Sequence, residues 1–252
     1  MSRSAFKFFV ILLFAALALY SCVLVPAYQY IVSDLVLMDT LWFDVVDLLL
    51  QWMEIFGTAV LFAFVVFAVY YPEPLGLKKL LLLLGGALLF KYAAAIIAIS
   101  IVYGTIDFTY NYSGYVAAFL IEAGLCTLIL LLCRKYIKKH RETNRATQNA
   151  ANMLGIAAEL EPPLLPFASL FDRKNPLQRT VMLSVGIFTL LRLASYILSD
   201  IAFSMAGALF TAADIPVMLV YWLILILIPC FLAYLLICLM LRFAERRLQS
   251  KN

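Results

Sequence analysis

Charged side chains are scarce in this chain of 252 residues: they make up 13% of it, and there is a single histidine, His140. Soluble domains are about 25% charged and about half apolar. Here 65% of the residues are hydrophobic and the mean hydropathy is +1.00, which excludes an ordinary water-soluble fold. Because each membrane crossing uses about 20 residues, up to six crossings would leave no room for a large catalytic domain outside the bilayer.

Motifs for catalysis and metal binding are also missing. One histidine supports neither a histidine-based triad nor an H-E-x-x-H zinc site. The five cysteines lie inside apolar runs without a C-x-x-C pair, a pattern typical of small buried residues. The sequence has no Walker-type phosphate loop and no G-x-S-x-G elbow. We therefore expect no metal, no cofactor and no catalytic residue, and an ATP-driven activity would need another subunit.

The sequence does contain long apolar runs, and they predict an all-α integral membrane protein with six transmembrane helices in one domain, residues 1–252. A cleaved signal peptide is the alternative for the first run, but its length favours a retained helix. Pro229 should kink the sixth run without ending it. The predicted runs are Phe8–Val25, Gln51–Tyr71, Leu80–Val102, Tyr115–Cys133, Thr180–Phe203 and Val217–Leu241.

The distribution of basic residues predicts the orientation. If the N-terminus lies inside, all but two of the 19 Lys and Arg fall in cytoplasmic segments, and the exceptions, Lys91 and Arg192, lie within helices. The positive-inside rule then places both termini and a loop over residues 134–179 in the cytoplasm. We expect a multi-pass protein of a cell membrane, of the bacterial plasma-membrane type.

Segments outside the predicted helices differ in character. The basic stretch Arg134–Arg141 should bind anionic lipid headgroups, and we expect no nucleic-acid partner because basic flanks are usual at this membrane face. Thr143–Ala151 is polar and predicted to be a linker. Glu161–Phe167 is proline-rich and should pack on the membrane or on a partner. On the opposite side, Pro26–Val46 has apolar residues at helical spacing, which predicts an amphipathic helix before the second crossing.

A polar seam is the most informative feature of the second crossing. Its five members are spaced by three or four residues and share one helix face, which should point into the bundle because carboxylates facing lipid are costly. Three other helices carry ionisable groups at comparable depth, so two acids can meet two bases. The seam consists of Asp44, Asp47, Gln51, Glu54 and Thr58, and the groups on the other helices are Lys91, Glu122 and Arg192.

Two interpretations of these groups remain open. They could form buried ion pairs that fix which helices are neighbours, or they could line a polar cavity that binds an ion or small solute. The second predicts a small transport or channel-like protein, or the membrane subunit of a transport complex. A non-catalytic scaffold or regulatory subunit is the alternative, and a lipid-acting enzyme is a third hypothesis; a protein partner or a second copy fits each. The candidate binding residues are Asp47, Gln51, Glu54, Lys91, Glu122 and Arg192.

Overall fold

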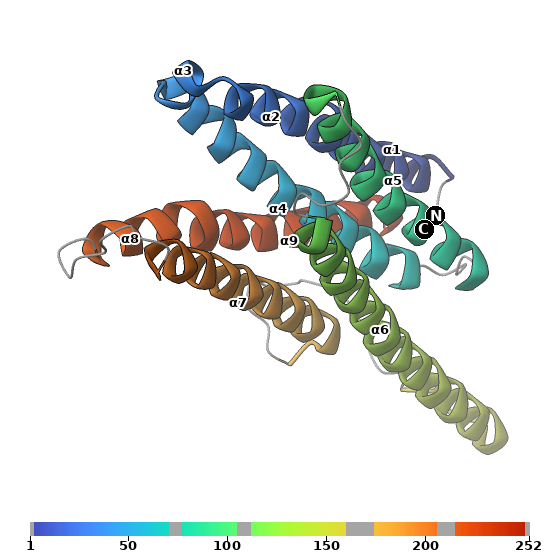
Figure 1. The fold of residues 1–252 in the computed structure, drawn as a ribbon. Helices are drawn as coiled ribbons and strands as arrows, with labels where there is room; N and C mark the ends of the chain where they lie inside the picture. Colours follow the sequence, from blue (N-terminus) through green and yellow to red (C-terminus); the bar gives the residue numbers. More distant parts are fainter. Residues whose placement is uncertain (1–2, 71–76, 105–111, 160–173, 206–214, 250–252) are drawn as a thin grey trace.

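The structure, a computed structural model, describes residues 3–70, 77–104, 112–159, 174–205 and 215–249. Within these residues the secondary structure is helical, and six stretches are long and apolar enough to cross a membrane, which confirms the predicted six-helix membrane fold (Figure 1). The helices are α1 (Arg3–Leu19), α2 (Val25–Ser33), α3 (Leu35–Met38), α4 (Leu41–Tyr70), α5 (Leu77–Tyr103), α6 (Tyr112–Leu154), α7 (Pro176–Met205), α8 (Ile215–Trp222) and α9 (Ile228–Gln249), with π-helical turns η1 (Tyr20–Leu24) and η2 (Leu223–Leu227).

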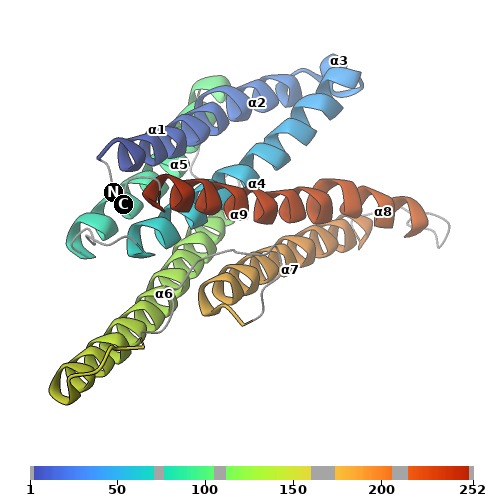
Figure 2. The same cartoon turned by 180° about the vertical axis from the view of Figure 1, so that it is seen from behind.

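Helix α4 is the centre of the bundle. It contacts α1, α2, α6 and α9, and both views show it crossing between the α1–α2–α5 group and the α7–α8–α9 group (Figures 1 and 2). Every residue from Ala59 to Val69 is buried, whereas Leu41, Trp42 and Leu49 in its first half are exposed. The second half of α4 is therefore enclosed by its neighbours, and the first half is only partly covered.

The two ends of the bundle carry different charges. The N- and C-termini lie beside each other at one end (Figure 1), as an even number of crossings requires. We call this the basic end, because Lys7, Lys78, Lys79 and the basic part of α6 beginning at Arg134 belong to it. The opposite end, where α2, α3 and the start of α4 meet, holds Asp34 and Asp44, and we call it the acidic end.

Two prolines are accommodated inside crossings by the same local device. Pro26 lies two residues after the end of η1, and Pro229 lies two residues after the end of η2. The residue between the turn and the proline donates its N–H to a carbonyl five residues earlier: Val25 donates to Tyr20, and Ile228 donates to Leu223. A π turn supplies the register change where proline removes a helical hydrogen bond. The first crossing consequently continues through Pro26 to Ser33, beyond the predicted end at Val25, and the sixth continues past Pro229 as expected.

The segment before the second crossing differs from the prediction of one amphipathic helix. Residues 26–33 extend the first crossing, and the helix breaks at Asp34, whose extended backbone and side chain cap the short helix α3. An aspartate side chain that accepts a backbone N–H favours a cap over a helix interior. The remaining residues, from Leu41 onward, already belong to α4, so the second crossing begins ten residues earlier than its apolar run.

The predicted linker Thr143–Ala151 is wrong, because α6 continues to Leu154. This stretch contains neither proline nor glycine. The hydroxyls of Thr143 and Thr147 donate to backbone carbonyls four residues earlier in the same helix. The helix ends at Gly155, whose φ of 67° is the left-handed conformation of a helix C-terminus, and Ile156 N–H donates to the Ala151 carbonyl. The proline-rich segment Glu161–Phe167 lies outside the described residues.

Candidate functional site

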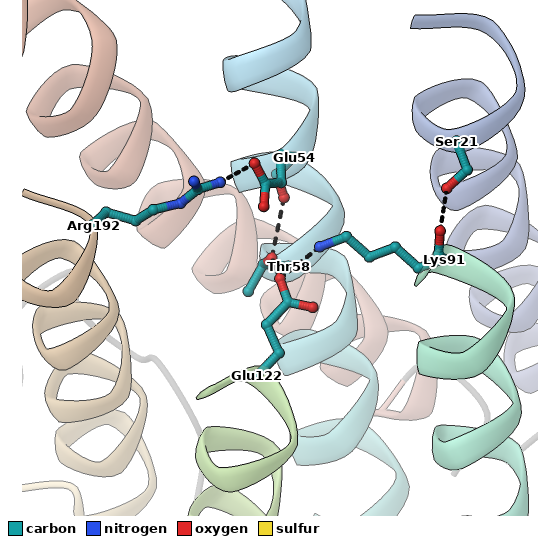
Figure 3. Close-up of polar contacts among 6 residues, drawn as sticks. All are labelled: Ser21, Glu54, Thr58, Lys91, Glu122 and Arg192. Carbon is teal, nitrogen blue, oxygen red and sulfur yellow. Dashed lines mark hydrogen bonds and ion pairs between the residues drawn. The ribbon is translucent and has the colours of Figure 1, made fainter. Parts of the chain in front are cut away.

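The polar seam lies on α4 as its spacing predicts, and its members become more buried along the helix. Asp44 is exposed, Asp47, Gln51 and Glu54 are half-buried, and Thr58 is buried. The seam therefore leads from the acidic end toward the middle of the bundle. Two ion pairs meet it there, one at Glu54 and one beside Thr58 (Figure 3).

The first ion pair joins α5 to α6 and is fully enclosed; we call it the inner pair. Lys91 Nζ lies 2.6 Å from Glu122 Oε1, and both side chains are 2% exposed. The Thr58 hydroxyl lies 2.5 Å from the same carboxylate oxygen, so it donates to Glu122 from α4. Helices α4, α5 and α6 are thus linked at one carboxylate, which satisfies the requirement that a buried charge be paired and hydrogen-bonded.

Aromatic rings complete the surroundings of Lys91. Its Nζ lies 5.4 Å from the centre of the Tyr20 ring and 5.1 Å from that of Tyr92, both within the range of cation–π attraction. Ser21, next to Tyr20 in η1, donates its hydroxyl to the Lys91 carbonyl at 2.8 Å. The π turn before Pro26 therefore places the Tyr20 ring and the Ser21 hydroxyl of the first crossing against Lys91.

The second ion pair, the outer pair, joins α7 to α4. The Arg192 guanidinium is paired with the Glu54 carboxylate and lies over the Phe188 ring, 5.7 Å from its centre. The side chains are 21% and 14% exposed, respectively, so this pair is less enclosed than Lys91–Glu122. Helix α7 packs mainly on α6 and α9, and the long arginine side chain reaches from it to α4.

A cavity of about 460 Å³ adjoins the outer pair. Its wall combines charged and amide side chains with tyrosines from several helices, and Ala117 of α6 and Leu191 and Ser195 of α7 are exposed residues at its edge. A volume of this size is within the range of small-molecule sites. The polar and aromatic lining consists of Tyr20, Tyr28, Gln29, Gln51, Glu54, Tyr92, Tyr115, Glu122, Phe188, Arg192 and Ser195.

Two polar atoms of this lining lack a partner. Glu122 Oε2 and Tyr92 Oη are buried and have no hydrogen-bond partner at good geometry within the described part of the chain, although the two side chains lie close to each other. Figure 3 shows Glu122 with one oxygen toward Thr58 and Lys91 and the other turned away from both. Because a buried polar atom without a partner costs about 1–3 kcal/mol, such atoms indicate a place for water or a ligand. A carboxylate oxygen needs a donor, and a phenol offers one hydrogen bond of each kind.

The structure brings four of the six candidate residues together at the cavity: Gln51, Glu54, Glu122 and Arg192 line it. Lys91 is bonded to Glu122 but is not part of the lining. Asp47 lies one turn toward the acidic end from Gln51, half-buried and also outside the lining.

Sequence reasoning missed the tyrosines of the site. Tyr20, Tyr92 and Tyr115 come from three different helices, and aromatic residues are frequent in all of them. No spacing distinguishes them from core or interfacial tyrosines. The signal for the π turn that carries Tyr20 is Pro26, which directly follows the predicted first run, because a proline within a helix requires a local change in it.

Comparisons with known proteins return no match: no family model fits the chain, and no curated protein and no solved structure is similar to it. The geometry of the cavity and its two ion pairs is therefore the basis on which a function can be inferred.

Proposed function

We propose that this polytopic membrane protein binds a small polar solute or ion in the cavity beside Glu54 and Arg192, and that it is a transport or channel-like protein or the membrane subunit of a transport complex. The observation that carries the proposal is the cavity itself, about 460 Å³ within the six-helix bundle and lined by two carboxylates and a guanidinium. Intramembrane ionisable groups usually belong to solute or proton pathways. We expect the basic end to face the cytoplasm of a plasma membrane.

The chemistry of the lining favours a ligand that donates hydrogen bonds. Glu122 Oε2 is an acceptor, and the nearby Tyr92 hydroxyl is not in hydrogen-bonding geometry with it, so both groups can bond to a ligand. Tyrosine rings beside carboxylates suit a small organic cation, since ring faces and carboxylates both attract positive charge. Arg192 and Glu54 would also accommodate a zwitterion: if their ion pair opened, Arg192 would bind its negative group and Glu54 its positive group.

A second candidate, a non-catalytic scaffold or regulatory subunit, is favoured by the pairing of the charges. Lys91 is paired with Glu122 and Arg192 with Glu54, so these four charges neutralise one another. Ion pairs of this kind would fix the helix neighbours without any ligand. The two candidates differ in one physical property, which is whether water reaches the cavity.

Cysteine accessibility tests this property. In a variant whose five native cysteines are replaced, we expect Ala117→Cys and Ser195→Cys at the cavity edge to react with a charged, membrane-impermeant methanethiosulfonate reagent. The thiol reacts as a thiolate, which forms only where water is present. The readout is the mass increase of the protein after labelling in proteoliposomes.

Exposed residues outside the cavity lining provide matched controls on the same two helices. Val116 and Leu190 are exposed but do not line the cavity, so Val116→Cys and Leu190→Cys should face lipid and remain unlabelled. Labelling of both cavity-edge variants above these controls supports a wet site. Equal absence of labelling in all four variants would contradict the proposed function and favour the scaffold.

A further inference from the structure

A second cavity lies at the basic end, away from the site described above. Its volume is about 430 Å³, and it lies between the last turn of α4, the first turn of α5 and the middle of α6. Its floor is apolar, and its rim is formed by one face of α6. The floor residues are Ala68, Val69, Leu77, Leu80, Leu130 and Ile137.

The rim is strongly basic. Arg134, Lys138, Arg141 and Arg145 all line the cavity, and their spacings of four, three and four residues place them along one face of α6. At about 1.5 Å per residue they cover about 16 Å of the helix. Among the described lining residues one acid is present, Glu142, which lies 3.6 Å from Lys138 as an exposed pair. Within this described lining the cations therefore outnumber the acids by three.

The order of apolar and basic residues along α6 matches a membrane boundary. Leu130, in the floor, lies one turn before Arg134. Arg134 is the first basic residue of this part of α6, and further basic residues follow over the next three turns. At this same level the crossing of α4 ends, at Val69, and the crossing of α5 begins, at Leu77. The floor thus lies where acyl chains are, and the rim lies where lipid headgroups are.

We propose that this cavity is a binding site for one anionic phospholipid. Its phosphate lies beside Arg134 and Lys138, and an acyl chain covers the floor formed by Leu77, Leu80 and Leu130. Arginine guanidinium groups bind phosphate oxygens through two parallel hydrogen bonds. A free phosphate would bond to the rim alone and leave the apolar floor uncovered, so the combination of rim and floor selects a lipid over a soluble anion.

Native mass spectrometry of the full chain tests the proposal. Protein in detergent micelles is titrated with phosphatidylglycerol or with phosphatidylcholine, and the bound lipid is counted. We expect the unchanged protein to retain one phosphatidylglycerol at concentrations at which phosphatidylcholine is not retained. The double variant Arg134→Gln/Lys138→Gln should lower retention at least tenfold, since each basic residue near an anionic headgroup contributes about 1 kcal/mol.

A control pair on the same helix separates a site from general attraction. Lys135 and Lys139 are exposed, have the same spacing and do not line the cavity. Lys135→Gln/Lys139→Gln removes equal charge and should keep retention within about twofold of the unchanged protein. Equal loss in both double variants, or equal retention of the two lipids by the unchanged protein, would overturn the proposal.

A third arm distinguishes the sources of phosphate. Inorganic phosphate, added at the same and at hundredfold higher concentration, should leave the bound phosphatidylglycerol in place, because it has no acyl chain for the floor. Displacement at equal concentration would assign the cavity to a soluble anion and contradict the lipid. The substitutions lie on the exposed face of α6, so unchanged circular dichroism and melting temperature will show that each variant is folded.

Discussion

The two ion pairs of the bundle contain similar groups but have different surroundings. The inner pair, Lys91 with Glu122, is 2% exposed on both sides, receives the Thr58 hydroxyl and is covered by aromatic rings. The outer pair, Arg192 with Glu54, lies at the wall of the larger cavity and is 21% and 14% exposed. Both pairs reach the cavity through a glutamate, but the side chains are almost fully enclosed in the inner pair and partly exposed in the outer pair.

This difference indicates a division of roles. Breaking an enclosed pair leaves a charge without a partner in a medium of low dielectric constant, so the inner pair should fix the contact of α4, α5 and α6. A pair beside a cavity has an alternative, because water or a ligand can replace either partner. We therefore expect the inner pair to determine stability and the outer pair to determine binding. Glu122 connects the two, since one oxygen belongs to the inner pair and the other lacks a partner.

The largest effect is expected from Lys91→Met. The substitution removes the ammonium group and leaves the Glu122 carboxylate buried without a positively charged partner, although the Thr58 hydroxyl still donates to it. The free energy of unfolding should fall by about 3–5 kcal/mol, the usual cost of breaking a buried pair. It is measured by titrating the protein with sodium dodecyl sulfate in mixed micelles.

The matched control for this prediction removes both charges. Lys91→Met/Glu122→Gln should recover at least half of the lost stability, because no unpaired charge remains. If the double variant is no more stable than the single one, packing around Lys91 matters more than its charge, and the role assigned to the inner pair is wrong.

A smaller loss of stability is expected from Thr58→Val. The change preserves shape and removes the hydroxyl that donates to Glu122, and hydrogen bonds to charged groups are worth about 1.5–3 kcal/mol. Thr127→Val is the control, because Thr127 is exposed on α6 and its hydroxyl bonds only to the Ala123 carbonyl in its own helix. Unfolding of the two variants should differ by about 2 kcal/mol. Equal losses would show that Thr58 contributes nothing beyond its helix.

Much of this fold follows from the sequence, because hydropathy and length suffice to find helices that cross a membrane. Six crossings and the cap of α7 were predictable: Asn175 Oδ1 accepts the Leu177 N–H at 2.9 Å, directly before Pro176. The placement of the seam on one face of α4 follows from its spacing. The boundaries were less predictable, since Asp44 and Asp47 interrupt the apolar run without interrupting the helix.

The pairing within the site was not predictable. Two acids and two bases at similar depth allow two pairings, and only the packing of the helices selects Lys91 with Glu122 and Arg192 with Glu54. The cavity is equally beyond sequence reasoning, since its wall is assembled from residues of η1, α2, α4, α5, α6 and α7. Helix α6 differs in the other direction: the polarity of Thr143–Ala151 predicts a linker, but no residue of this stretch ends a helix, and α6 continues until Gly155 ends it.

The smallest effect on stability, and the largest on binding, is expected from Glu54→Gln and Arg192→Gln. If water reaches the cavity, each freed charge is solvated, and the loss in unfolding free energy should be about 1 kcal/mol, as for pairs exposed to water. A dry cavity would instead raise the loss toward that of Lys91→Met. The same titration in sodium dodecyl sulfate therefore measures how far the two pairs differ.

Binding is measured on the same two variants with methylammonium, ethanolamine and glycine as probes. A probe that occupies the cavity raises the melting temperature of the unchanged protein, because a ligand that binds only the folded state stabilises it. Both variants should lose this increase while remaining folded. The exchanged variant Glu54→Arg/Arg192→Glu restores the ion pair with its two charges on the opposite helices. If the pair has only a structural role, this variant should recover the stability of the unchanged protein and respond to the probe as that protein does. Recovered stability without a probe response would identify the outer pair as part of a binding site, since only a ligand is sensitive to which side of the cavity holds the carboxylate.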